Sequence, residues 1–191
     1  TNEAYSVAKI AGIKLCESFN RQYGKSHKID YRCLMPTNLY GVGDNYHPIY
    51  SHVIPGLIQR FHNAKKNKKS TVVVWGTGNQ RRDFLNVDDL AFACHHIMNI
   101  NIKKYQQNIK PMCSHINVGS GSDLKIKELA KIIKNIIGFK GKIKFDKSKP
   151  DGMNRKILDI RLIKKLGWKA KYDLKKGLEK TYKDFLEREK I

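Results

Sequence analysis

The sequence predicts an α/β fold, and three features of the 191-residue chain indicate this class. Segments with an apolar residue at every third or fourth position, the spacing of an amphipathic helix, alternate with short apolar runs of strand length. Loops rich in glycine, asparagine, proline or aspartate separate them. Strands buried on both faces of a parallel sheet have such continuous apolar runs. Regular alternation of helices and strands is typical of α/β domains.

In the first half of the chain, we expect helices and strands to alternate around one long polar loop. The expected elements are a helix over residues 4–23, a strand over 31–35, a loop over 36–48, a helix over 52–64, a strand over 71–75 and a turn over 76–79. Phe84, Leu85 and Val87 predict a further short strand. Either Asp88 or Asp89 is expected to cap the helix that continues to about residue 99.

The second half continues the alternation. The expected elements are a strand over 115–118, a glycine- and serine-rich loop over 119–122, a helix over 125–137, a strand over 142–145, a loop through 150–152 and helices over 160–166 and 174–188. No G-x-x-G-x-x-G turn, the motif that holds a dinucleotide pyrophosphate, occurs in these 191 residues. We therefore expect that motif to lie upstream of Thr1.

The composition narrows the classes of function. Lysine and arginine outnumber aspartate and glutamate by 38 to 17, a net charge of +21. The lysines are spread over several predicted helix faces without a nucleic-acid motif, so we expect anionic small molecules rather than nucleic acid as partners. The four cysteines are far apart, which indicates neither a metal site nor a disulfide framework. No apolar run has the length of a membrane span, and we expect a soluble, cytoplasmic protein.

Tyr5 and Lys9 form the first candidate catalytic pair. They are four residues apart on a predicted helix, so their side chains share one face. An ammonium group beside a phenol favours the phenolate form, which suits a group that exchanges a proton during a reaction. A Y-x-x-x-K spacing also arises by chance on amphipathic helices, so the pair alone is a weak signal.

Longer motifs give the pair its context. The segments Tyr5–Lys9 (YSVAK), Pro36–Gly41 (PTNLYG), Arg82–Asp89 (RDFLNVDD) and Asn117–Gly121 (NVGSG) resemble the extended short-chain dehydrogenase/reductases. The segments Asp44–Pro48 (DNYHP), Ser51–Pro55 (SHVIP), Val74–Gly78 (VWGTG) and Lys149–Gly152 (KPDG) resemble the GDP-L-fucose synthases within that family. The resemblance covers essentially the whole chain. It implies the C-terminal part of a Rossmann-type NAD(P)-binding domain together with a smaller substrate-binding domain.

The resemblance also implies an activity. GDP-L-fucose synthases epimerise C3 and C5 of GDP-4-keto-6-deoxy-D-mannose and then reduce its C4 ketone with NADPH, giving GDP-L-fucose. In such a reaction Tyr5 would protonate the C4 oxygen, and Lys9 would bind the nicotinamide ribose and tune Tyr5. The residues that the resemblance implies for binding NADP are Lys9, Pro36, Thr37, Asn38, Leu39 and His52.

His52 would be the acid or base of the epimerisation, because an imidazole exchanges protons near neutral pH. His47 in the same loop is the alternative, and a helix-capping role is the structural alternative for His52. The partner of this histidine in the family is a cysteine that would lie upstream. We therefore expect that none of the cysteines of this chain, at positions 16, 33, 94 and 113, takes that role.

The resemblance implies a set of substrate-binding residues as well: Arg60, Trp75, Arg82 and Asp151. Cations would bind the diphosphate of the GDP-sugar, and Arg155 and Lys156 are further candidates. Without the resemblance, the two arginines would be interpreted as exposed ion-pair residues, and Trp75 as a core aromatic residue at a strand end.

We expect residues 1–48 and 82–121 to belong to the cofactor domain, and residues 49–81 and 122–191 to the substrate domain. The complete protein is expected to be a homodimer without metal. Two other functions stay open. One is another NAD-dependent nucleotide-sugar epimerase or dehydratase of the same superfamily. The other is a basic nucleic-acid-binding module that has kept only the fold.

Overall fold

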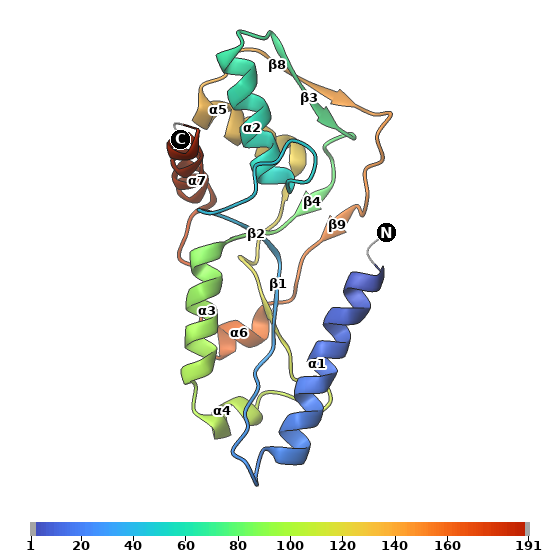
Figure 1. Cartoon of the computed structure of the whole chain (residues 1–191), viewed down its shortest axis with the longest axis vertical. Helices are drawn as coiled ribbons and strands as arrows, with labels where there is room; N and C mark the ends of the chain where they lie inside the picture. Colours follow the sequence, from blue (N-terminus) through green and yellow to red (C-terminus); the bar gives the residue numbers. More distant parts are fainter. Residues whose placement is uncertain (1–2, 190–191) are drawn as a thin grey trace.

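The computed structural model describes residues 3–189, and the prediction of an α/β fold is confirmed (Figure 1). Three pairs of strands are parallel: β1 (Leu34–Pro36) with β6 (Ile116–Val118), β2 (Asn38–Tyr40) with β5 (Phe84–Asn86), and β3 (Thr71–Trp75) with β8 (Lys142–Asp146). A three-stranded sheet has β4 (Arg81–Arg82) in its centre, antiparallel to β7 (Leu124–Lys125) and parallel to β9 (Arg155–Lys156).

The helices vary widely in length. They are α1 (Glu3–Tyr23), α2 (Val53–Lys66), α3 (Val87–Asn99), α4 (Ile102–Gln106), α5 (Ile126–Ile137), α6 (Arg161–Lys165) and α7 (Leu174–Arg188). α5 ends at Gly138, which has a φ of 72° and so takes the left-handed conformation that glycine favours after a helix. The ends expected for β3 and α7 match those observed, and the other expected helices and strands agree within a few residues.

The expected loop over residues 36–48 is only partly a loop, because Asn38–Tyr40 form β2. The partner of β2 is β5, from Phe84 to Asn86, so the pairing depends on residues far along the chain. The three residues of β2, close to Pro36, are too few to show the alternation of apolar and polar residues that predicts a strand. The strands β4, β7 and β9 and the helix α4 were not predicted, because they too are short: two residues in each strand and five in the helix.

The expected capping of α3 by Asp88 or Asp89 is wrong. Asn86 caps this helix, since its side-chain oxygen accepts a hydrogen bond from Asp88 N at 2.9 Å. Asp88 instead accepts a hydrogen bond from Lys180 Nζ at 2.8 Å. The buried carboxylate of Asp89 accepts hydrogen bonds from the backbone N–H groups of residues 171 and 172. Both acids therefore fasten the C-terminal region to α3.

The buried apolar residues form two clusters, one toward each end of the molecule in Figure 1. The first cluster lies among α2, β3, α5 and α7. The second lies among β6, α3 and α6. Strand β5 belongs to both, because Phe84 packs in the first cluster and the next residue, Leu85, in the second. Alternate side chains of a strand point to opposite faces, so β5 joins the two clusters.

Helix α1 contributes no residue to either cluster. The expected apolar positions Val7, Ile10 and Leu15 are each more than half exposed. One side chain of α1, that of Glu17, is buried, and it accepts hydrogen bonds from the N–H and the hydroxyl of Ser114 at 2.8 and 3.2 Å. Glu17 thus fastens α1 to the segment that leads into β6.

Within residues 3–189, no helix is long and apolar enough to cross a membrane. In the same part of the chain, no three histidine, cysteine, aspartate or glutamate side chains lie together in an arrangement that could hold a metal ion.

Candidate functional site

The predicted pair at the start of α1 lies together. Lys9 Nζ is 5.4 Å from the centroid of the Tyr5 ring, as the four-residue spacing on a helix requires. Tyr5 is 66% exposed, and Lys9 is also exposed. Neither side chain has a hydrogen bond to another element in the described part of the chain. The phenol and the ammonium are therefore free to meet a ligand.

The predicted cofactor-contacting segment Pro36–Leu39 lies at the carboxyl end of β1, the edge at which parallel sheets bind ligands. Thr37 N donates a hydrogen bond to Val118 O at 2.9 Å, which continues the pairing of β1 with β6. The hydroxyl of Thr37 and the amide of Asn38 both donate to the carbonyl oxygen of Asp83, at 3.1 and 2.8 Å. These bonds hold the segment in one conformation.

His52 is the N-cap residue of α2, but its side chain makes no capping hydrogen bond, and it is exposed. The structural alternative of a capping side chain therefore does not apply. Burial raises the pKa of the neighbouring Asp44 carboxyl above its ordinary value, against the opposing effects of a hydrogen bond from Asn45 N and the charge of His52. The other histidine of the loop, His47, accepts hydrogen bonds from Ile49 N and Tyr50 N, both at 3.2 Å. His47 thus orders the loop, while the imidazole of His52 stays accessible.

Trp75 lies at the end of β3 and is 58% exposed. The guanidinium carbon of Arg60 is 5.0 Å from the centroid of its ring, and Lys149 Nζ is 5.8 Å from it. Each cation is within the range of attraction to an aromatic face. The interpretation of Trp75 as a buried core residue is therefore excluded, and this exposed aromatic residue is surrounded by positive charge.

Asp151 fastens the loop that carries Lys149. Its carboxylate accepts hydrogen bonds from Thr77 N and Thr77 Oγ1, both at 2.6 Å, and from Gln80 Nε2 at 2.5 Å. These bonds, those from Thr77 foremost, lower the pKa of Asp151 below its ordinary value. The carboxylate oxygens are thus occupied by the protein itself. In this structure Asp151 arranges the turn after β3 rather than presenting a free carboxylate.

Arg82 lies in β4, the central strand of the sheet β7-β4-β9, and its side chain reaches this loop. A Cβ placed on Gly152 would be 3.9 Å from Arg82 Nη2, so the guanidinium lies against the glycine. Lys156 is the partner of Arg82 in the parallel pairing of β4 with β9. Residues paired in this way in adjacent parallel strands point to the same side. Arg82 and Lys156 therefore present two neighbouring cations to one face.

The structure brings together four of the residues predicted to bind substrate, since contacts run from Arg60 through Trp75 to the 149–152 loop and on to Arg82. It also brings together Tyr5 with Lys9. No hydrogen bond or ion pair between described residues joins the two groups, or joins either of them to His52. The arrangement consists of a phenol beside an ammonium and a separate cationic surface.

The described part of the chain has two cavities, of which one includes Arg60 of the cationic surface. One, of about 420 Å³, is lined by Arg60 together with Asn63 and Lys69 of the α2 region and by Thr71 and Val73 of β3. The other, of about 260 Å³, is lined by Tyr40, Ser120, Ser122 and the segment that begins α7. Burial raises the pKa of Tyr40 to about 12. Neither cavity is lined by Tyr5, Lys9 or His52.

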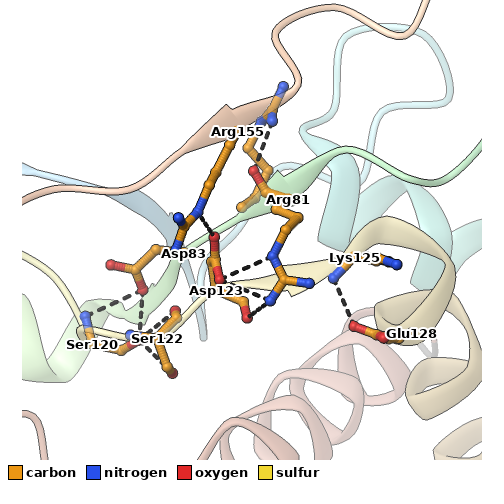
Figure 2. Close-up of polar contacts among 9 residues, drawn as sticks. Arg81, Asp83, Ser120, Ser122, Asp123, Lys125, Glu128 and Arg155 are labelled. Carbon is orange, nitrogen blue, oxygen red and sulfur yellow. Dashed lines mark hydrogen bonds and ion pairs between the residues drawn. The ribbon is translucent and has the colours of Figure 1, made fainter.

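Three residues of this region were not predicted from the sequence as candidate site residues. They are Lys149, Asp83 and Asp123. Asp83 is fully buried, with one oxygen bound to Ser120 and the other without a hydrogen bond among the described residues. Asp123 binds Arg81 and Arg155 (Figure 2). For Lys149, its place in the Lys149–Gly152 motif was a usable signal. Asp83 had the same kind of signal, since it lies in the Arg82–Asp89 motif, whereas Asp123 lies in no quoted motif and its partners are remote in sequence.

Known proteins resemble this chain along nearly all of its length. It is 54% identical to the GDP-L-fucose synthase of Escherichia coli, in an alignment that covers 98% of this chain and 57% of that enzyme. The chain thus spans little more than half of that relative. The structure of a GDP-D-glycero-L-gluco-heptose synthase from Campylobacter jejuni, solved in the presence of NADPH, is 34% identical with a TM-score of 0.86, and the match covers 97% of this chain and 61% of that one.

A GDP-L-fucose synthetase from Naegleria fowleri bound to NADP is 25% identical with a TM-score of 0.87, covering all of this chain and 57% of that one. The model of the NAD dependent epimerase/dehydratase family matches residues 1–119, more than half of the chain. This match contains the Tyr5–Lys9 pair, the Pro36–Leu39 segment and Arg82. The chain therefore belongs to the NAD dependent epimerase/dehydratase family.

Proposed function

We propose that the complete protein to which this chain belongs converts GDP-4-keto-6-deoxy-D-mannose to GDP-L-fucose, by epimerisation at C3 and C5 and reduction at C4. The observation that carries the proposal is the 54% identity to a GDP-L-fucose synthase along 98% of the chain. The geometry supports it, because a phenol beside an ammonium suits ketone reduction and a cationic surface with an exposed aromatic residue suits a GDP-sugar.

For the reduction, NADPH supplies the hydride when it is bound. The described residues fit its nicotinamide end by the chemistry of their groups. Lys9 offers an exposed ammonium for ribose hydroxyl groups, and the segment Pro36–Leu39 is fixed at the carboxyl end of β1. Tyr5 gives its hydroxyl proton to the C4 oxygen of the substrate. Lys9 stabilises the phenolate that remains.

For the epimerisation, His52 exchanges a proton at the carbon next to the ketone. Its exposed imidazole and the absence of a capping bond leave both ring nitrogens available. An imidazole is well suited to this step because it gains and loses protons near neutral pH. A matching acid or base on the other face of the sugar comes from the upstream part of the protein.

For substrate binding, Arg82 and Lys156 hold the diphosphate, and Arg60 and Trp75 contact the nucleotide. Two cations on neighbouring strands match two adjacent phosphates. Asp151 contributes by fixing the loop that places Lys149 on Trp75 and Gly152 beside Arg82. The positive charge of the chain assists the approach of this anionic substrate.

The wider organisation is part of the proposal. Residues 1–48 and 82–121 form the remainder of the cofactor domain, and residues 49–81 and 122–191 form the substrate domain. The two apolar clusters support this division in part. The exceptions are Ile160, Ile163, Leu166 and Trp168, which pack in the cluster of β6, and Tyr40 and Phe84, which pack in the cluster of α2. The complete protein is a homodimer in the cytoplasm.

The alternative is a related nucleotide-sugar enzyme. The 34% identity to a GDP-heptose synthase indicates that this fold and similar residues occur with other GDP-sugars. A second alternative is an NAD-dependent epimerase or dehydratase that regenerates its cofactor within each turnover.

The test uses the full-length protein with NADPH and GDP-4-keto-6-deoxy-D-mannose. We expect loss of NADPH absorbance, with GDP-L-fucose as the product identified by NMR. Consumption of NADPH with a GDP-heptose only would favour the first alternative. Interconversion of UDP-sugars without consumption of NADPH would contradict the proposal.

A further inference from the structure

The three-stranded sheet β7-β4-β9 carries cations on both faces. Arg81 of β4 is the partner of Arg155 of β9, and Arg82 is the partner of Lys156. Consecutive side chains of a strand point to opposite faces. Arg81 and Arg155 therefore face Asp123. The second pair, Arg82 and Lys156, points to the opposite face of the sheet.

Asp123 neutralises the first pair. Its Oδ1 accepts hydrogen bonds from Arg81 Nε and Nη2 at 3.1 and 2.9 Å, and its Oδ2 accepts one from Arg155 Nε at 2.5 Å. Arg81 Nη2 also donates to the backbone oxygen of Asp123 at 2.8 Å. Figure 2 shows the carboxylate between the two guanidinium groups. The side chain of Asp123 is 6% exposed.

The hydrogen bonds from Arg81 and then Arg155 hold the pKa of Asp123 at about 2. The carboxylate is thus charged at neutral pH. Without it, two like charges would lie opposite each other on adjacent strands, an arrangement that repels. The strands β4 and β9 pair over only two residues each, so little else opposes their separation at this point.

The second pair has no such partner. No carboxylate of the described residues forms an ion pair with Arg82 or Lys156. Among residues 3–189, the one side-chain hydrogen bond of Arg82 runs from Nη1 to the backbone oxygen of Arg81 at 2.8 Å. The spacing between Arg82 and Lys156 therefore depends on the pairing of β4 with β9, which Asp123 secures from the opposite face.

We propose that Asp123 is a positioning residue for the diphosphate of the substrate: it holds Arg81 and Arg155 together, and so aligns Arg82 with Lys156 on the other face of the same two strands. Asp123 itself contacts no substrate. This inference rests on the proposed function, since it assigns the diphosphate to Arg82 and Lys156.

The test measures GDP binding by calorimetry and steady-state kinetics of the full-length protein. Asp123→Asn should weaken GDP binding about tenfold, the size of effect found for coupled neighbours, raise the KM of the GDP-sugar by a similar factor and change kcat little. A purely structural defect would instead lower kcat, the affinity for NADPH and the melting temperature together. The matched control is Asp159→Asn, which removes an exposed carboxylate paired with Arg161 elsewhere.

A double variant separates positioning from general weakening. Because Asp123 acts through Arg82, Asp123→Asn should cost much less GDP affinity in an Arg82→Met background than in the wild-type protein. Arg155→Met, which removes an exposed partner and leaves the backbone pairing intact, should show a smaller loss in the same direction. If Asp123→Asn does not fold, the GDP affinity of Arg155→Met tests the proposal in its place.

Two results would overturn the inference alone: GDP affinity of Asp123→Asn and Arg155→Met equal to that of the wild type, or the same fold-loss from Asp123→Asn with and without Arg82. If the wild-type protein itself failed to bind GDP, the proposed function would be overturned together with this inference.

Discussion

The carboxylate of Asp83 accepts two hydrogen bonds from Ser120, one from the backbone N–H at 3.2 Å and one from the hydroxyl at 2.5 Å. Figure 2 shows both side chains beside the Asp123 network. Burial raises the pKa of Asp83 above its ordinary value although these hydrogen bonds oppose the shift. The backbone of Asp83 also holds Thr37 and Asn38, so one residue connects the loop after β6 with the segment after β1.

Gly119→Ala tests the space around this carboxylate. A Cβ at position 119 would be 2.4 Å from Asp83 Oδ2 and 3.4 Å from Ile160 Cγ2. We expect the variant to lower the free energy of unfolding of the full-length protein by about 1–3 kcal/mol, measured by urea denaturation. Ser122→Ala, on the exposed side of the same loop, should change it by less than about 0.5 kcal/mol. Equal stability of the two variants would refute the prediction.

Tyr5→Phe removes the proposed proton donor. In the full-length protein we expect the rate of NADPH oxidation to fall by a factor of about 10² to 10⁴, the usual contribution of a positioned acid. The affinity for GDP should stay unchanged, because the described contacts of Arg82 and Trp75 do not include Tyr5. Tyr31→Phe, which alters another half-exposed tyrosine, is the control. Undiminished turnover would remove Tyr5 from the mechanism.

His52→Gln tests the division of roles. We expect deuterium exchange from heavy water at C3 and C5 of the substrate to fall by a factor of about 10² or more. Reduction at C4 should continue and yield an unepimerised product, identified by NMR. His47→Gln addresses the alternative histidine, and His95→Gln, an exposed residue of α3, serves as the control. Normal exchange in His52→Gln with loss in His47→Gln would assign the role to His47.

Glu17→Gln tests how α1 is fastened. Burial alone would raise the pKa of Glu17, but hydrogen bonds from Lys14 and Ser114 bring it below its ordinary value. A lowered folded-state pKa stabilises the fold above the unfolded-state pKa, and this contribution is lost as the pH falls through the folded-state value. We expect a loss of about 1–2 kcal/mol near pH 7 that shrinks below about pH 4. Glu179→Gln, an exposed residue of α7, should show neither effect.

Sequence patterns predicted the long elements well, because α5 and α7 carry enough apolar residues for their period to be evident. The two-residue strands β4, β7 and β9 have no period of their own and exist through their partners. At the site, the resemblance gave Tyr5, Arg82 and the other candidates by motif. It did not single out Asp83, although this residue lies in the Arg82–Asp89 motif, and Asp123 lies in no motif. The contacts of these acids reach Ser120 and Arg155, more than thirty positions away, so local sequence does not reveal them.

The anchoring of α1 through Glu17 has a consequence at its other end. Tyr5 precedes Glu17 by twelve residues, a distance of about 18 Å along a helix axis. If α1 rotated as a rigid body by about 5° about Glu17, the phenol of Tyr5 would move sideways by about 1.6 Å. Displacements of that size are enough to spoil a proton transfer. A substitution at Ser114, which hydrogen-bonds Glu17, would therefore change the reduction rate if Tyr5 is the donor as proposed, because it would displace the phenol.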